Sequence, residues 1–144
     1  MPLDILFPAM TLAGWTFVVL LIIPVARFRA VGKGEATRED FALGESQRVP
    51  DYVRLPNRNY MHLLEMPVIF YAVVLIAFLS GQADKVSLAL AWTYVALRVI
   101  HSLVHLTANH VPVRLSLFAA SNIAMIALWG WVLAAMLEAR AFPG

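Results

Sequence analysis

Three long stretches without Asp, Glu, Lys or Arg constrain this chain more than any other feature. They cover residues 5–26, 66–83 and 115–137. Each is close to the about 20 apolar residues that a helix needs to cross a hydrocarbon layer about 30 Å thick. The stretches are too continuously apolar for barrel strands, and lipid favours helices because they satisfy their own backbone hydrogen bonds. Three membrane-spanning helices are therefore predicted.

A fourth segment, residues 86–107, is equally apolar except for Arg98, His101 and His105. Over the whole chain 61% of residues are hydrophobic and 14% are charged, against about 45–50% and about 25% in soluble domains. We therefore predict an all-α integral membrane protein, a single domain formed by an antiparallel bundle of four transmembrane helices. The spans are expected at about 5–28, 59–80, 86–107 and 112–137, with a long loop at 29–58.

Most basic residues lie in that loop or at its borders. Of the eleven Lys and Arg, seven lie between the first two spans: Arg27, Arg29, Lys33, Arg38, Arg48, Arg54 and Arg58. The positive-inside rule places this loop in the cytoplasm and both termini on the other side. The net charge of +2 gives no indication of a nucleic-acid partner, and the absence of cysteine excludes a thiol nucleophile and a cysteine-ligated metal.

Ionisable side chains inside the spans point to function, because they are costly in hydrocarbon. Arg98, His101 and His105 are spaced i, i+3 and i+7, so they share one helix face. Glu65 in the second span and Arg98 in the third both lie roughly 10–14 Å from the cytoplasmic end at 1.5 Å per residue. We therefore expect a buried ion pair between Glu65 and Arg98.

The same level of the bundle gathers further polar residues, namely Asn59, His62, His105 and Arg114. This is more polarity than one structural bridge requires, and it predicts a pocket for a charged, water-soluble molecule. A purely structural bridge between helices is the alternative. His101 and His105 could in principle bind a metal or haem, but no carboxylate adjoins them in sequence and no HExxH pattern occurs, so we predict no metal site.

Three motifs resemble those of the MAPEG family, the membrane-associated proteins of eicosanoid and glutathione metabolism. Residues 58–71 begin with Arg58 and Asn59 and continue to Glu65 and Pro67, and the second helix of that family similarly carries an Arg, an Asn and a Glu just before a proline. Residues 98–105 are similar to its Arg-x-x-His segment, and residues 112–114 to the Pro-x-Arg that opens its fourth helix. The string after Glu65 resembles the little-characterised bacterial branch most, which implies a bacterial inner membrane.

The resemblance implies a homotrimer of four-helix subunits that binds glutathione between neighbours at the cytosolic side, together with a hydrophobic substrate. By match, the residues lining the glutathione site are Arg58, His62, Glu65, Arg98, His101 and Arg114. In catalytic members an Arg at the start of the fourth helix stabilises the glutathione thiolate, and Arg114 is the candidate here. The implied activity is that of a glutathione-dependent transferase or peroxidase acting on hydrophobic electrophiles.

Two departures leave the activity open. His62 stands where the family has an Asn three residues before the Glu, and Phe118 where eicosanoid-processing members often have Tyr. A non-catalytic lipid-binding or scaffold protein of the same fold is the main alternative, so whether the chain is an enzyme stays open at this point. A small transporter using Glu65, Arg98 and His101 is a third, although no span is interrupted at its middle by paired Gly or Pro.

Overall fold

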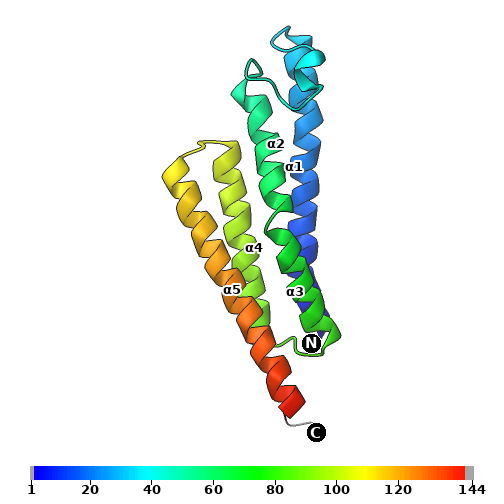
Figure 1. Ribbon diagram of the computed structural model, residues 1–144, viewed down its shortest axis with the longest axis vertical. Coiled ribbons are helices and arrows are strands. Elements are labelled where there is room, and N and C mark those ends of the chain that lie inside the picture. Colours follow the sequence, from blue (N-terminus) through cyan, green and yellow to red (C-terminus); the bar gives the residue numbers. More distant parts are fainter. Residues whose placement is uncertain (1, 142–144) are drawn as a thin grey trace.

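The computed structural model describes residues 2–141 and contains helices and no strand over that range (Figure 1). In chain order the elements are η1 (Pro2–Ile5), α1 (Leu6–Gly32), η2 (Glu39–Phe41), α2 (Asp51–Leu64), α3 (Pro67–Leu79), α4 (Lys85–Leu106) and α5 (Val111–Ala141), where η marks a 3-10 helix. Four segments are long and apolar enough to cross a membrane: Leu3–Gly32, Asp51–Leu79, Lys85–Leu106 and Val111–Ala141. The predicted all-α architecture with four spans is therefore confirmed.

The outer faces of these helices are apolar. Phe17, Val25 and Phe28 of α1 are largely exposed, as are Leu75 of α3 and Ile123 of α5. A soluble bundle would turn such side chains inward and present polar ones, since large exposed apolar patches are rare on soluble monomers. The surface of the bundle is therefore suited to lipid or to neighbouring protein.

The spans form two pairs that α4 joins. α1 packs along α2, and α4 packs along α5 and also contacts α1 and α2. In the core, the rings of Phe70 and Tyr94 lie 4.6 Å apart between centroids, and Leu12 and Leu128 are fully buried. Figure 1 shows α1 and α2 rising past the turn between α4 and α5. At this end of the bundle α1 and α2 therefore extend beyond α4 and α5, and α4 contacts helices of both pairs.

The connection between the first two spans is shorter than the expected loop at 29–58. α1 continues to Gly32, and α2 begins at Asp51 directly after Pro50. Charge alone had placed the boundary at Arg58, but the first turns of α2 are amphipathic, so a polar residue there does not end the helix. Gly34 closes α1 at a φ of 71°, a left-handed conformation that glycine adopts without steric cost.

Asp40 organises the remaining loop. Its carboxylate accepts hydrogen bonds from the Ser46 hydroxyl at 2.6 Å and from the Thr37 backbone N–H and hydroxyl at 2.9 and 3.0 Å. Arg48 adds an ion pair at 3.1 Å. The hydrogen bonds from Ser46 and Thr37, with the charge of Arg48, hold the pKa of Asp40 well below its usual value of 3.8. The loop therefore has a defined shape built around one ionised carboxylate.

Candidate functional site

The second span is broken between α2 and α3, and the break follows from Pro67. Proline has no N–H, so the carbonyl of Leu63 has no donor four residues on. α2 ends at Leu64, and Glu65 leaves the helical conformation with φ −77° and ψ −90°. The last helical hydrogen bond runs from the Glu65 N–H to the Met61 carbonyl at 3.1 Å. Backbone carbonyls at the end of α2 are thus open to other donors.

Arg98 of α4 supplies one such donor. Its Nη2 donates to the carbonyl of His62 at 3.3 Å, and its Nε donates to the Tyr94 hydroxyl at 3.2 Å. The guanidinium also lies over the rings of Tyr94 and Phe118, at 5.6 and 5.4 Å from their centroids. Cations stabilise helix C-termini, so Arg98 caps α2 where the proline interrupts it.

The expected ion pair between Glu65 and Arg98 is not formed, and that prediction was wrong. Glu65 Oε2 lies 3.1 Å from His62 Nδ1, and the Glu65 side chain is 57% exposed. Arg98 is 1% exposed, and no carboxylate within residues 2–141 lies within 4.0 Å of it. Arg98 does reach the backbone one turn before Glu65, but the Glu65 carboxylate points outward at the break in the helix. Arg98 is therefore a buried cation without an anionic partner in the described chain.

Three histidines meet beside Arg98. The ring centroids of His62, His101 and His105 lie 5.6 to 6.2 Å apart. His101 and His105 are buried, and neither ring nitrogen of His105 has a hydrogen-bond partner. Within the described residues, no group of three His, Cys, Asp or Glu side chains is arranged to hold a metal ion. The cluster therefore offers unsatisfied polar atoms next to a buried positive charge.

Arg114 lies at the wall of a cavity of about 210 Å³ at this end of the bundle. His62 of α2, His101 of α4 and Phe118 of α5 line the same cavity. Arg114 donates from Nη1 to the Asn109 side chain in the preceding turn, while its Nε is buried and has no partner. The turn thus fixes Arg114 at the first helical positions of α5. The cavity brings together one residue from each of the three motifs.

Two further predicted residues, Asn59 and Arg58, do not line the cavity. Asn59 is fully buried and donates from Nδ2 to the Ser102 hydroxyl at 2.6 Å. Trp15 of α1 donates to the same hydroxyl at 2.8 Å. Asn59 therefore links α2 to α4 in the helix packing rather than lining the cavity. Arg58 is exposed on α2 and forms no ion pair within 4.0 Å in the described range.

Sequence reasoning missed Ser102, Trp15, Tyr94 and Phe118 as partners of the polar residues. A serine next to His101 on a membrane helix was a usable signal for the Ser102 network, because buried hydroxyls need partners in lipid. No sequence signal pointed to the Arg98 contact with the His62 carbonyl, since it exists only where α2 breaks.

The order of these motifs along one four-span chain can be compared with known families. The model of the MAPEG family matches residues 5–134 of the 144. The chain belongs to the MAPEG family. As a MAPEG protein with four membrane-length helices, it is a multi-pass integral membrane protein. The family includes glutathione transferases, glutathione peroxidases and other members.

Searches of curated proteins and of solved structures found no match to this MAPEG chain. The match to the family model extends over all the residues discussed above, from Trp15 to Phe118. Family membership therefore establishes the class of protein, and members of this class differ in activity.

Proposed function

We propose that this MAPEG protein is a glutathione-dependent transferase or peroxidase acting on hydrophobic electrophiles that reach it from the bilayer. The observation that carries the proposal is the cavity at which Arg114, His62 and His101 meet. MAPEG proteins typically use glutathione, and each polar group of glutathione has a chemical counterpart among the side chains at this end of the bundle.

The excess positive charge of the site favours an anionic ligand. Arg98 and Arg114 have no carboxylate within 4.0 Å in residues 2–141, and an unpaired buried cation is costly. Glutathione carries two carboxylates, which suit arginine forks, and one ammonium group, which suits the exposed carboxylate of Glu65. Bound glutathione would thus neutralise arginine side chains for which the described chain provides no carboxylate.

The thiol chemistry follows from the same residues. A fixed cation such as Arg114 lowers the pKa of a nearby thiol, and the thiolate is the nucleophile. Glu65 holds Nδ1 of His62 at 3.1 Å, which leaves Nε2 to accept the thiol proton. The thiolate sulfur then forms a bond to an electrophilic carbon, and the leaving group departs with the bonding electrons.

The size of the cavity supports an assembly in which subunits share the site. At about 210 Å³ it is smaller than the roughly 300–1,000 Å³ of ordinary ligand pockets. One subunit can therefore enclose only part of a tripeptide. We propose a homotrimer in which a neighbouring copy encloses the rest, with the loop after α1 in the cytoplasm, both termini on the other side, and the inner membrane of a bacterium as the location.

The test is the conjugation of glutathione to 1-chloro-2,4-dinitrobenzene by purified protein. Arg114→Ala is expected to lower kcat/KM at least tenfold, about 1.4 kcal/mol, because the thiolate loses its cation. Arg140→Ala is the matched control, since it removes the same charge from the other end of α5. Equal turnover in both variants would remove Arg114 from the mechanism.

The alternative is a non-catalytic lipid-binding or scaffold protein of the same fold. Glutathione should raise the melting temperature if it binds the folded protein. A melting temperature that does not change with glutathione, in protein that remains folded, would favour the alternative.

A further inference from the structure

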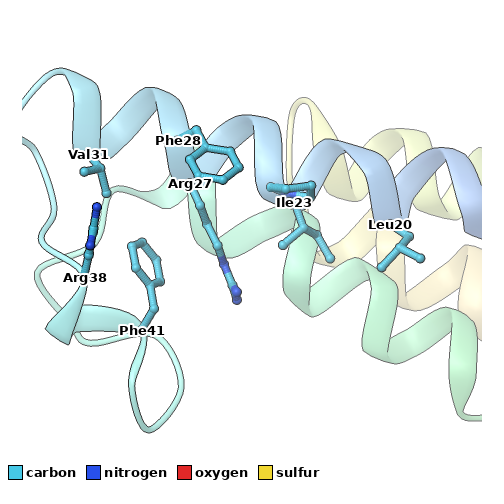
Figure 2. A pocket seen from close by; sticks show the side chains of 8 residues that line it. Leu20, Ile23, Arg27, Phe28, Val31, Arg38 and Phe41 are labelled. Atoms are coloured by element: carbon cyan, nitrogen blue, oxygen red, sulfur yellow. The ribbon is translucent and has the colours of Figure 1, made fainter.

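A second and larger cavity lies between the C-terminal half of α1 and the loop that folds back on it. Its volume is about 670 Å³, within the range of small-molecule sites. It shares no lining residue with the cavity at Arg114. Figure 2 shows Leu20, Ile23 and Arg27 projecting from α1, with Phe41 from the loop beside Arg27. We call this space the α1–loop cavity.

The lining of the α1–loop cavity changes from apolar to cationic along the helix. Leu20 and Ile23 belong to the uncharged stretch that crosses the hydrocarbon, whereas Arg27 is the first charged residue after it. Leu20 and Arg27 are separated by about 10 Å along the helix axis. Arg38 joins Arg27 at the charged end, and Figure 2 shows it beside Val31. This order, apolar and then cationic, is the order of the groups in a phospholipid from acyl chain to phosphate.

The charged end of the cavity is not neutralised by the chain itself. Arg27 Nη2 pairs with Glu45 Oε1 at 3.1 Å, but Arg27 Nε is buried and has no partner. Arg38 is exposed and has no carboxylate within 4.0 Å in residues 2–141. The guanidinium of Arg27 lies over the ring of Phe41, 5.0 Å from its centroid, which holds it in place. Of the two guanidiniums that line the cavity, only that of Arg27 has a carboxylate partner, Glu45.

We propose that the α1–loop cavity binds one anionic phospholipid, its phosphate between Arg27 and Arg38 and the start of an acyl chain against Leu20 and Ile23. Guanidinium groups bind phosphate oxygens through paired hydrogen bonds. Phe28, which is 79% exposed next to the cavity, extends the apolar surface that an acyl chain would follow. This site is separate from the glutathione chemistry proposed above and does not depend on it.

The test measures how much phosphatidylglycerol stays bound to purified full-length protein, by native mass spectrometry from mixed phosphatidylglycerol and phosphatidylcholine nanodiscs. Arg38→Gln is expected to lower bound phosphatidylglycerol at least threefold. Arg29→Gln is the matched control: it removes one charge from the same end of α1, but Arg29 lies near Tyr52 and outside the cavity. General attraction of basic residues to anionic membranes would affect both variants alike.

A second variant tests the shape of the cavity without changing charge. Val31→Trp places a large ring where Val31, 37% exposed, now lines the space. It should lower bound phosphatidylglycerol to a similar extent while the protein still melts cooperatively. Equal lipid retention in Arg38→Gln and Arg29→Gln would overturn the proposal, and so would full retention in Val31→Trp. A changed subunit number with unchanged lipid retention would instead assign the cavity to a second copy of the chain.

Discussion

Two neighbouring polar clusters on the buried side of α4 differ in how their groups are partnered. In the first, the Ser102 hydroxyl accepts hydrogen bonds from Trp15 and Asn59, which joins α1, α2 and α4. In the second, Arg98 has no carboxylate partner within 4.0 Å in the described range, and His105 has no hydrogen-bond partner at either ring nitrogen. Ser102 lies four residues after Arg98 and three before His105 on the same buried side of the helix, so burial does not explain the difference.

The contrast separates polar residues that join the helices from polar residues whose charge or hydrogen bonds a ligand can still satisfy. The Trp15 and Asn59 N–H groups both have an acceptor in Ser102, although Asn59 Oδ1 is buried without a partner. Arg98 donates to the His62 carbonyl and the Tyr94 hydroxyl but has no counter-charge, and His105 has no partner at either ring nitrogen. Buried groups of this kind cost free energy until a ligand supplies the partner, so we assign Ser102 and Asn59 to a structural cluster, and Arg98 and His105 to a ligand-binding cluster.

The largest stability effect is expected in the structural cluster around Ser102. Ser102→Ala leaves the donors of Trp15 and Asn59 without an acceptor, which should lower the free energy of unfolding by about 2 kcal/mol. Ser116→Ala is the control, because Ser116 is exposed and bonds only the Pro112 carbonyl of its own helix. Unfolding in detergent–lipid micelles measures both. Equal stability of the two variants would show that the Ser102 network is not structural.

The next effect concerns ligand affinity. Arg98→Met keeps the volume of the side chain and removes the buried charge, so glutathione should bind at least tenfold more weakly, about 1.4 kcal/mol. Arg48→Met is the control, since Arg48 is paired with Asp40 in the loop and its side chain is 83% exposed. Calorimetric titration measures both affinities. Unchanged affinity in Arg98→Met would place the ligand away from Arg98.

His105 gives a smaller effect of the opposite sign. Replacing a buried group that lacks partners by an apolar one removes a desolvation cost, so His105→Leu should stabilise the ligand-free protein by about 1 kcal/mol. His110→Leu in the exposed turn after α4 should leave the stability unchanged. Thermal unfolding without glutathione is the measurement. A loss of stability in His105→Leu would mean that the ring already has a partner.

The smallest effect is local and depends on pH. The folded state lowers the pKa of Asp40, so its contribution to loop stability is present above 3.8 and is lost as pH falls toward the lower folded value. Hydrogen exchange in residues 37–48, corrected for intrinsic rates, should accelerate as pH drops below 3.8. In Asp40→Asn exchange should be fast already at pH 7 and depend little on pH. A wild-type loop whose protection does not change below pH 3.8 would contradict this account.

The fold could be predicted because the length of the uncharged stretches determines how many helices can cross the membrane. Residues 5–26 and 115–137 are long enough to span a membrane whatever their neighbours do. The start of α2 was harder to predict, because residues 51–58 mix polar and apolar side chains and only their amphipathic pattern indicates a helix. Charged residues indicate where a chain leaves the hydrocarbon layer. A helix can continue beyond that point, as α1 and α2 do here.

The site could be predicted only in part. The sequence gives the position of a residue along its span more directly than the direction in which its side chain points. His62, His101 and Arg114 were expected at one level, and they line one cavity. The partner of Arg98 could not be predicted, because the backbone carbonyl of His62 becomes available only through the break before Pro67. A local change of backbone path therefore decided which groups meet.

The break between α2 and α3 also separates the two halves of that span mechanically. Pro67 has no N–H to donate to the turn before it. The two helices of the second span, α2 and α3, are therefore joined by side-chain contacts rather than by a continuous series of backbone hydrogen bonds. The aromatic contact of Phe70 with Tyr94 holds α3 against α4 beyond the break, whereas α2 is held by Asn59 and by the Arg98 bond to the His62 carbonyl. The position of the binding end relative to α3 is therefore set by contacts with α4 rather than by a continuous helix.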